Sequence, residues 1–449
     1  MVLPASVTLC GPPRQEGTPM HLKDAVDAAR ERYRAGNPAS ERQLAEAAMV
    51  MPGGNTRTVL FHAPFPLTMV RGEGAHLWDA DGHRYLDALG EFTAGLFGHS
   101  NAAIRQAIVA ALDDGLSLSS HNRREVALAS EIQRRFPSMA LMRFTNSGTE
   151  ASLLALATAQ VFTGRRKILV FDGAYHGGLL SFGRGGSPIN APYDCLIAPY
   201  NDLPAVEALV REHGAALAAI MVEPMLGAGG CIPGDAAFLQ GLRDLTRRCG
   251  ALLVFDEVQT SRLSFGGRQA LLGIAPDLTA IGKYFGGGLS FGAFGGREDC
   301  MQRFDPRRPD ALAHAGTFNN NVLSMAAGLA GLQQVLSEAA LTALNQRGER
   351  LRERLNAVLR AQDVPAQFTG LGSIMNLHGM TGPVRCVADL APSSGLMKEL
   401  LYFELLERGV YMAQRGLVAL SLPFDDAACD TMVAAFEDAV RARAGVLRG

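Results

Sequence analysis

The stretch CGALLVFDEVQ, residues 249–259, is an apolar run that ends in two acidic residues, Asp256 and Glu257. Its length and its continuous Leu, Val and Phe content are typical of a strand that is buried on both faces. Three further runs of the same kind alternate with helical patterns: RKILVFDGAY (166–175), AALAAIMVEPM (215–225) and DLTAIGKY (277–284). This alternation predicts an α/β fold built on a mostly parallel sheet.

Polar residues follow these runs at the point where each strand is expected to end. Tyr175, Glu223, Asp256 and Lys283 all lie there, and ligands of parallel sheets bind beyond the carboxyl ends of the strands. Lys283 is the only basic residue between 277 and 292, among glycine and apolar residues. A solvated surface loop would explain it. The alternative is a buried lysine that loses its proton and acts as a nucleophile.

A third polar group precedes a predicted helix, in LMRFTNSGTEASLLALATAQ (141–160). Ser147, Gly148 and Thr149 stand where this helix begins, so free N–H groups and two hydroxyls surround a glycine that permits close approach. Such a helix start can bind an anion. A plain helix cap by Ser147 or Thr149 is the simpler interpretation of this motif taken alone.

Together, the lysine, the strand-end carboxylate and the anion site suit one cofactor, pyridoxal 5′-phosphate. Lys283 would bond to its aldehyde carbon, and Asp256 would keep its pyridine nitrogen protonated so that the ring accepts electrons. The phosphate would lie on residues 147–149, and Tyr175 would cover one ring face. Two alternatives remain open at this point: Tyr175 as a core tyrosine and Glu223 as a cap of its own turn.

Two nucleotide sites can be tested against the same residues. Asp256 and Glu257 after an apolar strand resemble the metal-binding strand of a P-loop NTPase, which also requires G-x-x-x-x-G-K-[ST]. The first glycine of the motif would lie five residues before Gly282, but Asp277 occupies that position. Tyr284 follows Lys283, where the motif requires Ser or Thr. No G-x-G-x-x-G follows a strand either, so a Rossmann dinucleotide site is unsupported.

Composition narrows the class of partner. The formal net charge is −2, which provides no basic surface for nucleic acid or anionic lipid. No apolar run approaches the length of a membrane span. The seven cysteines are scattered and include no CxxC pair, so we expect no metal site, no disulfide framework and a reducing, cytoplasmic location.

The rest of the chain has clear local patterns. Residues 22–36 form an amphipathic helical pattern closed by glycine, and residues 75–89 predict a hairpin with an Asp-Gly turn. After about Leu323 come long helices, short strands over 368–378 and 410–422, and a last helix. The Pro- and Gly-rich residues 1–19 carry no signal-peptide pattern, and Met20 is a candidate start directly before the first helix.

Six motifs, in order, resemble the class III pyridoxal-phosphate aminotransferases: FTNSGTEA, YHG, VEP, VFDEVQTSR, IGKYFGGG and GTFNNN. The resemblance extends from about Asn37 to the C-terminus. Within the class it is nearest to the branch of glutamate-1-semialdehyde aminomutase, and there to bacterial β-phenylalanine (aromatic β-amino acid) aminotransferases, through residues 51–67, 282–296 and 315–328. Gln259, where this branch often has Met, and the Ala413-Gln414-Arg415 sequence depart from the pattern.

This resemblance implies fold type I, with a large domain around a seven-stranded, mostly parallel sheet and a smaller α+β domain from both chain ends. It implies that 20–75 are part of the small domain, 76–325 the large cofactor-binding domain and 326–449 the C-terminal small domain, while the Pro- and Gly-rich composition of 1–19 predicts a disordered extension. It also implies a homodimer with active sites at the interface. Thr317 would then reach the phosphate of the neighbouring subunit's cofactor, Val258 would pack on the ring face opposite Tyr175, and Glu223 would support the ring hydroxyl region.

Two arginines match substrate-binding positions of the β-phenylalanine group, Arg57 and Arg415. Arginine pairs both oxygens of a carboxylate, whereas a surface ion pair explains either residue taken alone. The resemblance implies a ping-pong transamination from an aromatic β-amino acid to 2-oxoglutarate or pyruvate. Two other functions are weighed: an aminomutase, which GTFNNNV disfavours because the mutases carry Ser-Gly-Asn-Pro there, and a cofactor-binding protein without turnover, which intact Lys283 and Asp256 disfavour.

Overall fold

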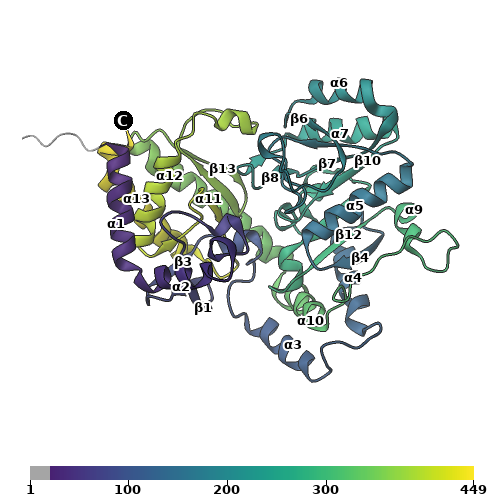
Figure 1. Ribbon diagram of the computed structural model, residues 1–449, viewed down its shortest axis with the longest axis horizontal. Coiled ribbons are helices and arrows are strands. Elements are labelled where there is room, and N and C mark those ends of the chain that lie inside the picture. Colours follow the sequence, from purple (N-terminus) through teal and green to yellow (C-terminus); the bar gives the residue numbers. More distant parts are fainter. Residues whose placement is uncertain (1–20, 449) are drawn as a thin grey trace, which may run out of the picture.

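The computed structural model describes residues 21–448, and one side of the molecule is built around a seven-stranded sheet (Figure 1). The prediction for residues 1–19 falls outside the described part. In sheet order the strands are β4 (Leu141–Thr145), β12 (Gly292–Gly296), β11 (Leu278–Gly282), β10 (Leu252–Asp256), β7 (Leu217–Val222), β5 (Lys167–Phe171) and β6 (Asp194–Ala198).

The sheet is parallel except for one strand. β10 lies between β7 and β11 and runs parallel to both, whereas β12 is antiparallel to β11 and β4. Every residue of β7, β10, β11 and β12 is buried, which explains why these strands have continuous rather than alternating apolar sequences. The predicted α/β architecture with a seven-stranded, mostly parallel sheet is confirmed.

Helices cover this sheet and connect its strands. Helix α5 packs across β7, β10, β11 and β12, and α7 packs on β7 and β10. The helices of this part are α3 (Ala102–Leu112), α4 (Arg123–Arg135), α5 (Gly148–Thr163), α6 (Leu203–His213), α7 (Ala236–Cys249), α8 (Gly267–Leu272) and α9 (Glu298–Met301). A two-stranded ribbon, β8 (Met225–Leu226) with β9 (Ile232–Pro233), follows β7.

The two ends of the chain meet on the other side of the molecule (Figure 1). β1 (Met69–Glu73), β2 (His76–Asp79) and β3 (Arg84–Asp87) form an antiparallel sheet, and β15 (Val410–Tyr411) joins it parallel to β3. The predicted hairpin is therefore present as β2 and β3. A second sheet contains β13 (Gln367–Leu371), β14 (Ile374–His378) and β16 (Leu417–Ala419).

The helices that pack around these two sheets or against each other are α1 (Leu22–Gly36), α2 (Pro38–Ala48), α11 (Glu338–Ala361), α12 (Gly395–Glu407) and α13 (Asp426–Leu447). α10 (Val322–Ala330) packs instead on α3 and α4 (Figure 1). α1 coincides with the predicted amphipathic helix and buries Ala25, Val26, Ala29 and Tyr33. The long helical pattern after Leu323 is interrupted, because a π-turn over Gly331–Val335 and the cap residue Ser337 separate α10 from α11.

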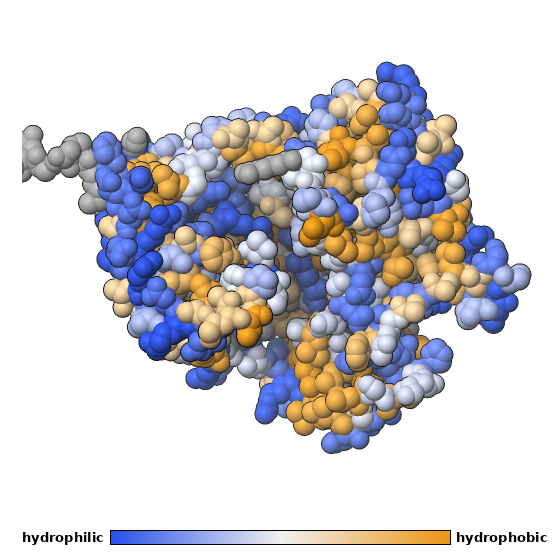
Figure 2. All heavy atoms as spheres, in the orientation of Figure 1, coloured by the Kyte–Doolittle hydropathy of each residue, from blue (hydrophilic) through white to orange (hydrophobic). Residues whose placement is uncertain are grey.

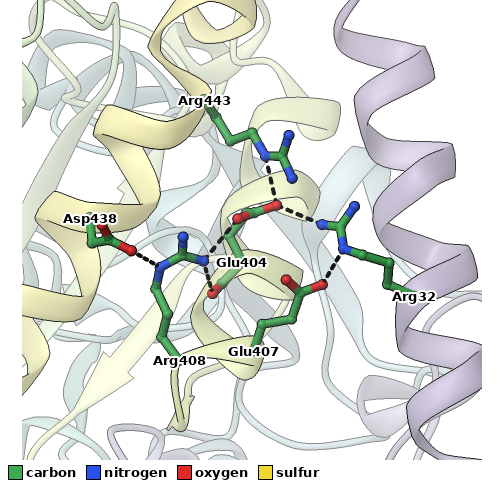
Figure 3. A network of polar contacts seen from close by, with 6 residues as sticks. All are labelled: Arg32, Glu404, Glu407, Arg408, Asp438 and Arg443. Carbon is green, nitrogen blue, oxygen red and sulfur yellow. Dashed lines mark hydrogen bonds and ion pairs between the residues drawn. The ribbon is translucent and has the colours of Figure 1, made fainter.

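A buried carboxylate fastens α1 to the C-terminal helices (Figure 3). The side chain of Glu404 on α12 is 2% exposed and pairs with Arg32 of α1, with Arg443 of α13 and with Arg408, each at 2.8 Å. Three cations around one carboxylate compensate the cost of burying its charge.

None of the helices within residues 21–448 combines the length and the apolar character needed to cross a bilayer. The division of the chain into domains at 19/20, 75/76 and 325/326 stays a prediction.

Candidate active site

The carboxyl ends of β7, β10 and β11 bring Glu223, Asp256 and Lys283 to one edge of the sheet, as predicted. Asp256 is the last residue of β10, while Glu223 and Lys283 directly follow β7 and β11. Strand register fixes this grouping, since Phe255 lies opposite Val222 and Asp256 opposite Ala280. Their side chains therefore share one site.

Asp256 is held by a histidine. Oδ2 of Asp256 lies 2.8 Å from Nδ1 of His176, and Oδ1 accepts a hydrogen bond of 3.0 Å from the Val258 amide. Both side chains are at most 5% exposed. Because an ionised carboxylate can only accept, Nδ1 of His176 is the donor. The Nε2 atom of His176 is buried with no hydrogen-bond partner among residues 21–448.

Glu223 is a second buried carboxylate beside this pair. It accepts hydrogen bonds from the amides of Tyr175 at 2.9 Å and Gly227 at 3.0 Å. Burial raises the pKa of the Glu223 carboxyl, the His176 charge opposes that rise, and the nearby Asp256 carboxylate adds to it. Glu223 therefore does more than cap its own turn, because it also ties the end of β5 to that of β7.

Lys283 is partly buried and stands at φ +59°, a left-handed conformation that is uncommon outside glycine. Its Nζ donates a hydrogen bond of 2.7 Å to the carbonyl oxygen of Phe92. Burial lowers the pKa of the Lys283 amine to about 8, while the Asp256 carboxylate raises it and the Arg57 guanidinium lowers it further. With this pKa roughly a tenth of the amine is neutral at pH 7, far more than for an ordinary lysine, and the neutral form is the one that a nucleophile requires.

The start of α5 forms a cradle of backbone next to the lysine. A Cβ on Gly148 would lie 2.9 Å from Val258, one on Gly282 would lie 3.3 Å from the Gly148 amide nitrogen, and one on Gly177 would lie 2.2 Å from Thr149 Oγ1. Gly148 and Gly177 therefore leave no free space for a side chain where an anion would meet the helix start, and Gly282 leaves little. Ser147 caps the helix by accepting from the Glu150 amide at 3.2 Å, so the capping interpretation also holds for that hydroxyl.

Tyr175 is not a core tyrosine, since 44% of the residue is exposed at the end of β5. Val258 is partly buried and touches Gly148. The cradle, the buried carboxylate and the lysine with its lowered pKa suit phosphate, pyridine nitrogen and aldehyde respectively. The residues present fit pyridoxal 5′-phosphate.

Arg57 and Arg415 come together on one aromatic ring, although 358 positions separate them in the chain. The guanidinium carbon of Arg57 lies 5.5 Å from the ring centroid of Phe92, and that of Arg415 lies 5.4 Å from it. Arg57 also pairs with the Glu91 carboxylate. The carbonyl oxygen of the same Phe92 holds Lys283, so this one residue contacts both arginines and the lysine.

Thr317 lies apart from this cluster in the single chain. It is exposed in the segment before α10 and lines a cavity of 510 Å³ with residues 116–122. Asn319, two residues later, accepts a hydrogen bond of 2.9 Å from Asn146, so the segment passes close to the start of α5.

Sequence reasoning missed His176, Glu91 and Phe92. His176 belongs to the YHG motif, and its position directly after the predicted site residue Tyr175 could have indicated that it is part of the site. Glu91 and Phe92 belong to a turn, Gly90–Thr93, in which all four residues have φ between +47° and +79°. No sequence rule predicts that conformation for Glu, Phe and Thr in succession.

Comparison with known proteins decides the family. The model of the family "Aminotransferase class-III" matches residues 61–440. The chain is a class III aminotransferase. Members of this class bind pyridoxal phosphate, so this aminotransferase is a pyridoxal-phosphate enzyme.

Individual relatives agree with this assignment. This aminotransferase is 54% identical to a β-phenylalanine transaminase of Variovorax paradoxus over 92% of its own chain and 95% of the relative. It is 36% identical to a glutamate-1-semialdehyde 2,1-aminomutase of Heliobacterium modesticaldum, over 89% and 96%. A crystal structure of a β-phenylalanine aminotransferase from Variovorax paradoxus superimposes with a TM-score of 0.93 at 53% identity, covering 95% and 99% of the two chains.

Proposed function

We propose that this aminotransferase transfers the amino group of an aromatic β-amino acid, such as (S)-β-phenylalanine, to 2-oxoglutarate or pyruvate. The observation that carries the proposal is the pair of arginines, Arg57 and Arg415, on the Phe92 ring beside Lys283. The β-amino acid places its carboxylate one methylene further from the reacting carbon than the α-keto acid does. Two guanidinium groups at one lysine suit two such substrates that use the site in turn.

The similarity to the Variovorax paradoxus enzyme supports this substrate class. Arg57 would bind the carboxylate of the β-amino acid. Arg415 is partly buried and precedes Gly416, which has φ +103°, and it would take the α-carboxylate of the keto acid.

Bound pyridoxal phosphate supplies a pyridinium ring that accepts electrons from the substrate carbon. Asp256 would hold the proton on the ring nitrogen. Lys283 would anchor the aldehyde carbon, C4′, and then, as a free amine, would take the proton from the substrate carbon as general base and deliver it to C4′ as general acid.

The remaining cofactor contacts follow the same geometry. Ser147, Gly148 and Thr149 would hold the phosphate, and Tyr175 and Val258 would lie on opposite ring faces. Glu223 would support the ring hydroxyl region through the network that it shares with His176 and Asp256.

We propose in addition that the functional unit is a homodimer with Thr317 reaching the partner subunit's cofactor phosphate. Apolar side chains are exposed on α3 and on the segments beside Thr317, and Figure 2 shows apolar atoms gathered over this end of the molecule. These side chains are Val109, Leu112, Leu116, Leu118 and Phe318, each 44–59% exposed. A surface of this kind supports burial against a second copy.

The test separates the two half-reactions by following the cofactor spectrum of the holoenzyme in single turnovers. Arg57→Ala should slow the half-reaction with β-phenylalanine by about ten- to a hundredfold, the value of one charge-assisted hydrogen bond. Arg415→Ala should spare that half-reaction and slow the one with 2-oxoglutarate or pyruvate. Equal losses in both half-reactions for Arg415→Ala would contradict this division.

The similarity to an aminomutase at 36% identity makes isomerisation of glutamate-1-semialdehyde the second candidate. The same assay decides between the two. A mutase would leave the spectrum unchanged with β-phenylalanine and respond to a diamino or amino-aldehyde substrate instead. A protein without turnover would respond to neither.

A further inference from the structure

Arg57, the proposed carboxylate ligand, already has a carboxylate partner within the chain. The Glu91 side chain pairs with the Arg57 guanidinium, and the two side chains are 54% and 45% exposed. Glu91 precedes Phe92, which contacts Arg57, Arg415 and Lys283. Glu91 is therefore placed where the carboxylate of a bound substrate would have to meet Arg57.

The backbone that carries Glu91 is fixed from both sides. Oδ1 of Asp87 accepts hydrogen bonds from the amides of Leu89 at 2.9 Å and Gly90 at 3.0 Å. At the other end of the Gly90–Thr93 turn, the fully buried Arg262 donates to the Thr93 carbonyl at 3.3 Å. The turn therefore keeps its left-handed conformation while the Glu91 side chain stays at the surface.

The Glu91 side chain has room to leave Arg57. It lines a cavity of 360 Å³ together with Leu60 and Phe92, and another of 490 Å³ together with His99 and Arg105. Movement of this side chain requires rotation about its own bonds only, since the backbone is anchored.

We infer that Glu91 is a specificity-determining residue whose carboxylate occupies Arg57 until a substrate carboxylate takes its place. The inference rests on the proposed function, in which Arg57 binds the carboxylate of the β-amino acid. One carboxylate replaces another, so Arg57 stays paired throughout the exchange. When an amine without a carboxylate binds, Arg57 remains paired with Glu91 and no unpaired cation is left next to an apolar substrate.

The size of the effect follows from the exposure of the pair. Exposed ion pairs are weak and screened by salt, so Glu91 is a mild competitor. Its removal should tighten the binding of a carboxylate ligand by about two- to fivefold. A stronger pair would exclude the substrate, and the exposure of both side chains prevents that.

The experiment measures the affinity of the holoenzyme for 3-phenylpropionate, which has the carboxylate and the ring of β-phenylalanine but no amine to react. Calorimetric titrations compare wild type, Glu91→Gln, Arg57→Ala and the double variant. We expect Glu91→Gln to tighten binding about two- to fivefold, and Arg57→Ala to weaken it about ten- to a hundredfold. In the Arg57→Ala background, Glu91→Gln should change the affinity by less than about 1.5-fold.

Glu73→Gln is the matched control, because Glu73 pairs with Arg71 on β1 and both side chains are about 60% exposed, as in a plain surface pair. It should leave the affinity unchanged. Steady-state kinetics provide a second test, because kcat/KM for two substrates should change in opposite directions. For Glu91→Gln, the kcat/KM for β-phenylalanine should rise and that for 1-phenylethylamine should fall, whereas damage to the turn would lower both.

The possible outcomes test the role of Arg57 and the role of Glu91 separately. If Arg57→Ala binds 3-phenylpropionate as wild type does, the proposed role of Arg57 is wrong and the inference fails with it. If Arg57→Ala weakens binding but Glu91→Gln does not tighten it, or tightens it equally without Arg57, the carboxylate role of Arg57 stands and the role of Glu91 is overturned.

Discussion

Two buried carboxylates of this aminotransferase have opposite surroundings. Glu404 is enclosed by Arg32, Arg408 and Arg443, so fixed cations surround its charge (Figure 3). Glu223 is held by two backbone amides and lies near a second carboxylate, Asp256, with one histidine between their charges. In the first arrangement, arginines of the protein itself compensate the charge of the buried carboxylate. The second leaves negative charge that a cationic cofactor ring can neutralise, which distinguishes a functional from a structural acidic residue.

Among the expected effects of substitutions, the largest is in the active site, which contains Glu223 and Asp256. Lys283→Ala should reduce turnover by a factor on the order of 10⁴ or more, since one amine serves as covalent anchor and proton carrier. Folding should be unaffected, because truncation removes a charge from a partly buried position. Steady-state rates measure the loss of turnover, and circular dichroism shows whether the variant is folded. In wild type, borohydride should attach the cofactor to the peptide that contains Lys283, and a labelled peptide from elsewhere would refute the assignment.

Asp256→Asn should retain the cofactor but lose most of its catalytic power. A carboxylate about 4 Å from a pyridinium contributes roughly 4 kcal/mol at an effective dielectric near 20, equivalent to about a thousandfold in rate. The half-reaction with β-phenylalanine measures the loss. His176→Asn serves as the companion variant and should lose less, because it leaves the Asp256 charge in place. A near wild-type rate for Asp256→Asn would move the pyridine partner to another residue.

Glu404→Gln should have the opposite effect to the active-site variants: it should lower the free energy of unfolding and leave the activity per folded molecule unchanged. Breaking a buried ion pair costs about 3–5 kcal/mol, which the partial exposure of the three arginines reduces to about 2–4 kcal/mol. The shift of the urea unfolding midpoint measures it. Glu407→Gln is the control, since Glu407 is 38% exposed and, within residues 21–448, pairs with Arg32 alone, so the change should cost under about 1 kcal/mol. Equal losses for both variants would mean that burial of Glu404 does not matter.

The smallest effect expected is in pH dependence. Covalent capture of pyridoxal phosphate by the cofactor-free protein requires the neutral amine of Lys283, whose pKa is about 8. The neutral fraction grows as pH rises, so the capture rate should increase about tenfold per unit below pH 8 and level off above it. Absorbance after mixing measures the rate. A plateau only near pH 10 would show that burial does not lower this pKa.

The sequence predicted the sheet and the strand-end residues for one physical reason. Strands such as β7 and β10 are buried on both faces, so their apolar runs stand out, and the polar residue after each run is forced to the same edge. Arg57 and Arg415 were predicted from the family resemblance alone. Their meeting on Phe92 could not be predicted, because it depends on a turn whose φ values contradict local preferences and which Asp87, three residues before the turn, and the distant Arg262 hold in place.

His176 shows a different limit. Its role depends on Asp256, 80 positions later, and a histidine after a strand has many possible partners in a sequence. The boundary between the long helices after Leu323 could not be given from the sequence for a local reason, since Gly331 and the run that follows it keep the apolar character of a helix up to the cap at Ser337.

The pairing of β3 with β15 affects the order in which the chain can fold during synthesis. Leu86 lies opposite Val410, so one edge of β3 has no partner until the ribosome has nearly finished. At about 5–20 residues per second, roughly 320 further residues take on the order of 16–65 s to make. An unpaired strand edge invites wrong pairing. Slow translation or a chain that stops before residue 410 should therefore leave a nascent protein that depends on chaperones, whereas the strands of the seven-stranded sheet are all complete by residue 296.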